Sequence, residues 1–108
     1  MNLEDLQSIA LKVKESYAQL KQKNNDPQWT SMDYTASFVG DVGDLIKLVM
    51  AKNNLRYIED LDHKLEHELS DCLWSILIIA KEFNIDLEKV FVNNIEQLNN
   101  KLQDKLKV

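Results

Sequence analysis

The stretch HELSDCLWSILIIA, residues 67–80, joins two carboxylates to an almost unbroken apolar run. An α-helix turns by about 100° per residue, so Glu68 and Asp71 lie roughly 60° apart on one side of a helix. The apolar residues recur in steps of three and four and form one broad face: Leu65, Leu69, Cys72, Leu73, Ile76, Leu77 and Ala80. The stretch therefore predicts a core helix that carries two acids at the edge of its apolar face, not on the opposite side, where solvated charges belong.

A second stretch, YTASFVGDVGDLIKLVM at residues 34–50, repeats this arrangement with Asp41 and Asp44. Asp41 lies near the centre of an apolar stripe, because several apolar side chains fall within about 80° of it on a helical wheel. Burying an ionised carboxylate without a partner costs several kcal/mol. A salt bridge explains one such acid, whereas four acids on two helices indicate a cation held between the helices.

Length and composition favour one all-α domain over residues 1–108. The chain has 108 residues, 44% of them hydrophobic and 29% charged, with two glycines and one proline, so long helices are favoured over a sheet that needs many tight turns. The formal net charge of -5 argues against a basic nucleic-acid-binding surface. No apolar run is long enough to cross a membrane, and MNLEDLQ does not resemble a signal peptide, so we expect a cytoplasmic protein.

Periodicity predicts four helices. The first covers residues 3–22, the second runs from a cap at Ser31 or Asp33 to about Asn53, and the third covers residues 61–83. Asn84 is expected to end the third helix, and Asp86 is expected to cap a long amphipathic fourth helix.

Three smaller features accompany these helices. The single cysteine, Cys72, excludes an intrachain disulfide and is expected to be a small core residue. Gly40 and Gly43 directly precede the two acids Asp41 and Asp44; they allow close approach either of a ligand or backbone, or of a packed helix. Trp74 and Ile78 lie off the main apolar face of residues 61–83, and a helix that is apolar nearly all round is buried on more than one side. We therefore expect the face that carries Trp74 and Ile78 to meet another subunit, and we predict a homo-oligomer, a dimer or a dimer of dimers.

Four carboxylates with no cysteine ligand form an all-oxygen site. Such ligands suit Mg²⁺ or Mn²⁺, and Mg²⁺ is usually completed by waters and substrate phosphates. The acids therefore predict a metal site for a phosphate-bearing substrate.

The sequence also resembles a known family. GDVGDLIKLVM followed by HELSDCLWSILIIAKEFNIDLEKVF is similar to the MazG-like nucleotide pyrophosphohydrolases, the all-α NTP pyrophosphatases, over residues 29–98. The resemblance implies a four-helix bundle completed by oligomerisation, and Mg²⁺-dependent hydrolysis of a nucleoside triphosphate to the monophosphate and pyrophosphate. It implies metal-binding and catalytic roles for Asp41, Asp44, Glu68 and Asp71.

Two departures from the family pattern are visible. The family usually has Glu in the first acidic pair, whereas this chain has Asp41 and Asp44, as a subgroup of short members does. A basic residue that contacts phosphates in the last helix of many members is replaced here by Asn93 and Asn94.

Several other residues have two interpretations. Aromatics from the region of Trp29 and Tyr34 stack on the base in related enzymes, so the resemblance implies that role here. The alternative is that Trp29 closes the open end of the core. Lys52 and Asn94 are candidates for phosphate contact, and Lys52 is equally explained as a solvated lysine at a helix end. Lys64 is explained in the same two ways.

The histidines His63 and His67 are four residues apart, but no third ligand follows at suitable spacing. We expect surface histidines that face away from the carboxylates.

Three functions remain open. The first is the pyrophosphohydrolase. The second is a non-catalytic helical oligomer of the same fold that binds nucleotide or metal. The third is a structural bundle whose acids are salt-bridged to Lys52 or Lys64.

Overall fold

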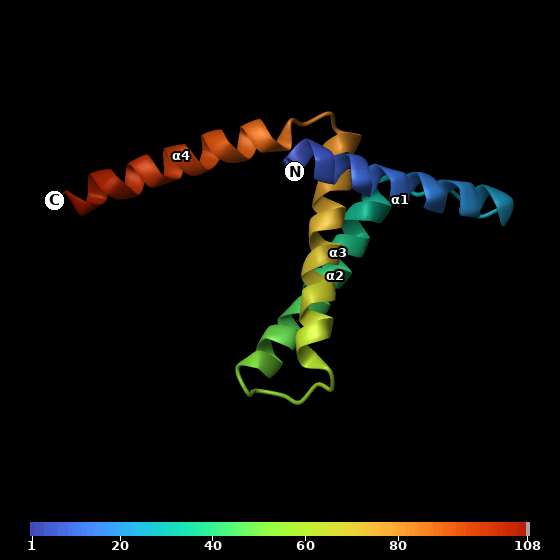
Figure 1. Cartoon of the computed structure of the whole chain (residues 1–108), viewed down its shortest axis with the longest axis horizontal. Helices are drawn as coiled ribbons and strands as arrows, with labels where there is room; N and C mark the ends of the chain where they lie inside the picture. Colours follow the sequence, from blue (N-terminus) through green and yellow to red (C-terminus); the bar gives the residue numbers. More distant parts are fainter. Residues whose placement is uncertain (108) are drawn as a thin grey trace.

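The computed structural model describes residues 1–107 and contains four α-helices, which confirms the predicted all-α class (Figure 1). They are α1 (Leu3–Lys23), α2 (Ser31–Lys52), α3 (Leu61–Glu82) and α4 (Leu87–Leu106). No strand occurs among residues 1–107. The boundaries lie close to those that the apolar periodicity predicts.

The start of α2 corrects the predicted cap. Thr30, and not Ser31 or Asp33, is the N-cap: its hydroxyl accepts from the Asp33 N–H at 3.4 Å, while the Asp33 carboxylate accepts from the Thr30 N–H at 2.8 Å. Asp33 belongs to the cap as the third helical residue, because this reciprocal box satisfies two N–H groups that the helix leaves free. Asp86 is confirmed as the cap of α4 and accepts from the Lys89 N–H at 3.2 Å.

Helices α1, α2 and α3 are each followed by an asparagine in the left-handed conformation. Asn25, Asn54 and Asn84 each adopt a left-handed backbone with φ of 57°, 61° and 55°. After α3, the Ile85 N–H donates to the Ala80 carbonyl at 2.9 Å, and the Asn84 N–H donates to the Lys81 carbonyl at 3.1 Å. These are the two bonds of a Schellman motif, which satisfies carbonyls at a helix end. The predicted role of Asn84 is confirmed, and asparagine does at three ends what glycine usually does.

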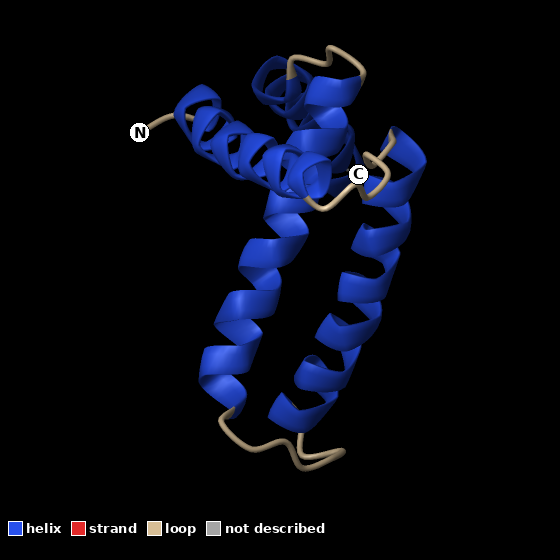
Figure 2. Cartoon of the chain, turned by 90° about the vertical axis from the view of Figure 1, so that its right-hand side faces the viewer, coloured by secondary structure: helices blue, strands red, loops and turns tan. Residues whose placement is uncertain are grey.

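Helices α2 and α3 form an antiparallel hairpin, and α1 crosses one end of it (Figure 2). Two side-chain bonds dock α1 on α3: Trp74 Nε1 donates to the Ala10 carbonyl at 3.1 Å, and Gln7 Nε2 donates to the Leu77 carbonyl at 3.1 Å. Ile78 is 0% exposed in the resulting core. The prediction that Trp74 and Ile78 face another subunit is therefore wrong, because the apolar face of α1 in the same chain covers them.

Helix α4 points away from the hairpin and leaves the bundle open within one chain (Figure 1). None of its residues is buried. The Cα radius of gyration is 17.6 Å, against about 13 Å for a compact chain of this length. The apolar stripe of α4 is exposed, and so are apolar residues of the hairpin: Val39, Ile46, Met50, Leu69, Leu73 and Ile76.

The glycines of α2 lie on an open surface. Apart from the adjacent residues and the nearby backbone of α2 itself, a Cβ atom at Gly40 or Gly43 would meet no atom within 4 Å among the described residues. Close packing against another helix of this chain is therefore not their role.

Within residues 1–107, none of the helices combines the length and the apolar character that crossing a membrane requires.

Candidate metal centre

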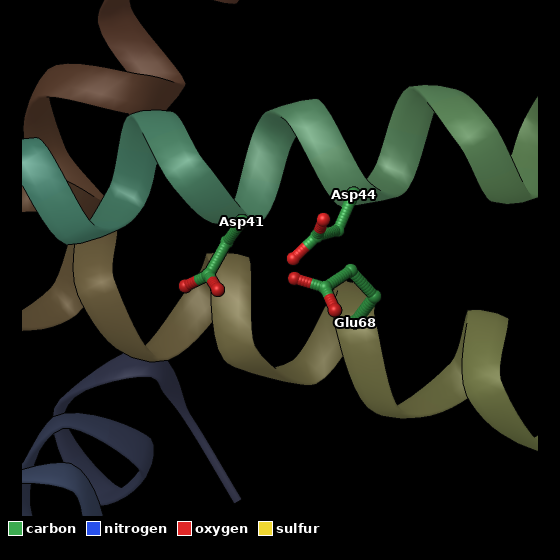
Figure 3. A group of neighbouring side chains, drawn as sticks. All are labelled: Asp41, Asp44 and Glu68. Atoms are coloured by element: carbon green, nitrogen blue, oxygen red, sulfur yellow. The ribbon is translucent and has the colours of Figure 1, made fainter.

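Three of the four predicted acids meet between α2 and α3. Asp41 and Asp44 project from α2 and Glu68 projects from α3 into the same space (Figure 3). One carboxylate oxygen from each lies within 4.8 Å of the others. Asp41 and Glu68 are half-buried, and Asp44 is exposed. The antiparallel hairpin produces this meeting, because acids three residues apart on α2 lie on successive turns that face α3.

The fourth acid, Asp71, lies at the edge of this group. It follows Glu68 on α3, and its carboxylate Oδ2 is 3.3 Å from Nε2 of His67. It also shares a pocket wall with Asp41. The structure thus places Asp71 beside the other acids but outside the three-carboxylate cluster. It also corrects the prediction for His67, which is exposed as expected but faces a carboxylate, because the two residues are one helical turn apart.

Glu68 is in an unfavourable setting for a carboxylate without a cation. Its Oε1 atom is buried and has no hydrogen-bond partner among the described residues. Burial above all, and then the Asp41 carboxylate, raise the pKa of Glu68 above its usual value; Asp71 and Asp44 raise it further. Among residues 1–107, no lysine or arginine forms an ion pair with the Glu68 side chain or with those of Asp41 and Asp44.

These donors fit a hard divalent cation. Carboxylate oxygens are the ligands that Mg²⁺ and Mn²⁺ prefer. A cation would neutralise the repulsion among the acids and would give the buried Glu68 oxygen a partner. The nearby Cys72 is not a competing ligand: it is buried as predicted, and burial, with the acids, raises the pKa of its thiol.

An aromatic pocket of about 450 Å³ opens beside the acids. Asp41 and Asp71 line it at the acidic end. Its rings touch edge to face in sequence, with centroids 5.4 Å apart for Trp29 and Tyr34, 6.0 Å for Tyr34 and Trp74, and 6.2 Å for Trp74 and Tyr17. Two of these rings are the predicted Trp29 and Tyr34.

Sequence reasoning missed the contribution of α1 to this pocket. Val13, Tyr17 and Lys21 line it and recur every four residues. That spacing marks one helix face but does not say what the face meets. Only the docking of α1 on α3 places this face beside the acids.

Two other predicted binding residues, Lys52 and Asn94, lie away from the aromatic pocket. Lys52 forms an ion pair with Asp62 near the far end of the hairpin. Asn94 is exposed on α4. Lys64 and His63 line a second pocket, of about 500 Å³, which Asp44 and Glu68 also line.

The geometry defines a class of protein: an all-α chain whose central helix pair holds a carboxylate centre next to an aromatic pocket. The family model described as the MazG nucleotide pyrophosphohydrolase domain matches residues 30–105. The chain belongs to this family, whose activity is that of a hydrolase acting on nucleotides. No curated protein and no solved structure gave a significant match to the chain.

Proposed function

We propose that this protein is a Mg²⁺-dependent nucleoside triphosphate pyrophosphohydrolase, which converts a (d)NTP and water into the (d)NMP and pyrophosphate. The observation that carries the proposal is the buried, unpaired Glu68 oxygen within the cluster of Asp41, Asp44 and Glu68. Membership of the family and the adjoining aromatic pocket support it.

The residues divide into two groups in this proposal. Asp41, Asp44 and Glu68, with Asp71 beside them, hold the metal and position the attacking water. When bound, Mg²⁺ neutralises phosphate charge and lowers the pKa of a coordinated water, and Mn²⁺ can replace it. Trp29, Tyr34 and Trp74 receive the base, since stacking on aromatic faces suits any base.

We further propose that the working form is a homo-oligomer. An apolar stripe runs along the exposed α4, and α2 and α3 each leave an apolar face uncovered. Contiguous exposed apolar surface of this kind marks an interaction site. A second copy supplies the same faces and would complete the bundle that one chain leaves open.

A cytoplasmic location remains a prediction.

The proposal is tested by assaying pyrophosphate release from the common ribo- and deoxyribonucleoside triphosphates, with Mg²⁺, with Mn²⁺ and with a chelator. Release of pyrophosphate with either metal, and none with chelator, is the expected result. Binding of nucleotide and Mg²⁺ without release from any substrate would instead favour the second candidate, a non-catalytic nucleotide-binding oligomer. This second candidate is motivated by Asp41 and Asp44, which are shorter than the glutamates that the family usually has in the first acidic pair.

A further inference from the structure

Helix α1 forms one wall of the aromatic pocket although it lies outside the family match, which begins at residue 30. The wall runs along one face of α1 from Val13 to Lys21, a length of about 12 Å at 1.5 Å per residue. Its residues can therefore adapt the pocket of this chain to a particular ligand.

Lys21 lies at the end of the pocket where Trp29 leads into α2. The acids lie at the other end, since Asp41 is ten residues after Ser31, about 15 Å along α2. If the acids hold the phosphates, as the proposed function requires, the base reaches toward Lys21.

The backbone at Lys21 is tied to the loop that follows α1. The Asp26 N–H donates to the Lys21 carbonyl at 2.8 Å, and Gln28 Nε2 donates to the Ala18 carbonyl at 2.9 Å. These bonds hold Trp29 against α1, with Lys21 Nζ 5.0 Å from the Trp29 ring centroid.

The Lys21 side chain is half-buried, and within residues 1–107 it forms no ion pair with a carboxylate. An ammonium group donates hydrogen bonds and accepts none. The Trp29 indole N–H at the same end is also a donor only. The Tyr17 hydroxyl both donates and accepts, so it does not discriminate between a donor and an acceptor on the ligand. The chemistry of this end of the pocket therefore matches an acceptor on the ligand.

We propose that Lys21 selects nucleotides whose base carries an exocyclic oxo group, as uracil, thymine, hypoxanthine and guanine do, at the position where cytosine and adenine carry an amino group. An oxo group accepts from the ammonium, whereas an amino group places a donor against a donor. This proposal rests on the proposed function for the placement of the phosphates at the acids.

The test compares matched substrate pairs: UTP with CTP, and ITP with ATP. We expect kcat/KM for the oxo member to exceed that for the amino member at least about tenfold, the size of a hydrogen bond to a charged group. In Lys21→Met, the ratio of kcat/KM for the oxo member to kcat/KM for the amino member falls to within about twofold of one. In Lys21→Glu, whose carboxylate presents hydrogen-bond acceptors, the amino member is preferred. Lys23→Met changes a nearby exposed lysine that does not line the pocket and keeps the wild-type ratio.

A second readout separates this inference from the proposed function. Binding of the same pairs in Mg²⁺ is followed by tryptophan fluorescence, since both tryptophans of the chain line the pocket. Discrimination in binding without pyrophosphate release would support the role of Lys21 and overturn the proposed hydrolysis. Hydrolysis with equal use of both members, or a preference that Lys21→Met leaves unchanged, would overturn the role of Lys21 alone. Absence of both binding and release would overturn both.

Discussion

At the scale of single residues, the ionisation of Glu68 connects the stability of the fold to the binding of metal. Its folded-state pKa is raised, chiefly by burial, whereas in the unfolded chain it is close to 4.5. Ionisation of Glu68 therefore costs stability in the metal-free protein. The cost is absent below pH 4.5, grows as pH rises from 4.5 towards the raised pKa, and is present in full above that pKa.

We predict that Glu68→Gln raises the melting temperature of the metal-free protein by a few degrees at pH 7, and by less at pH 4, because it removes a buried charge. Added Mg²⁺ should stabilise the wild type with a shift that grows with concentration, and should stabilise Glu68→Gln far less. Thermal unfolding with chelator and with a Mg²⁺ series measures both effects. The control is Glu66→Gln, an exposed glutamate on the same helix. Equal Mg²⁺ shifts in all three proteins would contradict a metal site at Glu68.

At the scale of helices, the left-handed asparagines control where each helix stops. Asn54 follows α2 with φ 61°, and the Leu55 N–H donates across it to the Met50 carbonyl at 2.9 Å. This conformation costs most residues with a Cβ atom about 1–2 kcal/mol, but glycine has no Cβ atom to clash, and asparagine tolerates it because its short polar side chain can hydrogen-bond locally.

We therefore predict that Asn54→Ala destabilises the fold by about 1 kcal/mol, whereas Asn54→Gly stays within about 0.5 kcal/mol of the wild type. Urea unfolding followed by circular dichroism compares the two variants. Asn100→Ala, in the interior of α4, serves as a control with a helical backbone. Indistinguishable stabilities for Asn54→Ala and Asn54→Gly would show that backbone strain at this position does not matter.

The helices themselves were predictable because their signals are local. Apolar spacing marks each helix, Asn84 marks the end of α3, and Asp86 marks the start of α4. The cap at Thr30 was missed because Ser31, Asp33 and Thr30 all have capping side chains, and only the reciprocal bonds between Thr30 and Asp33 distinguish them. The meeting of Asp41, Asp44 and Glu68 was predictable for the same local reason, since an acid within or beside an apolar stripe can be recognised on one helix alone.

At the scale of the whole molecule, the contacts between helices were not predictable from spacing. The faces of α3 that carry Trp74 and Leu73 look equally apolar in sequence. The structure covers Trp74 with α1 and leaves Leu73 43% exposed. For the same reason the role of Lys21 in the pocket wall could not be read from the sequence of α1.

The exposed stripe of α4 leads to a prediction about assembly. We expect a mass above the 12.6 kDa of one chain by size-exclusion chromatography with light scattering. The double variant Ile95→Asp and Leu98→Asp should shift the protein to monomer, because it places two charges in the proposed interface. The control, Asn93→Asp with Asn100→Asp, adds the same charge on the opposite side of α4. A monomeric wild type, or loss of assembly in the control alone, would contradict an interface along this stripe.

The most direct test of the central claim is Mg²⁺-dependent pyrophosphate release by wild type, Glu68→Gln, Asp71→Asn and the control Glu66→Gln, with folding checked by circular dichroism. The account predicts release by wild type and by Glu66→Gln, and a loss of at least about a hundredfold in the other two with the helical spectrum unchanged. Undiminished release by both Glu68→Gln and Asp71→Asn would contradict the assignment of the carboxylate cluster as the active centre.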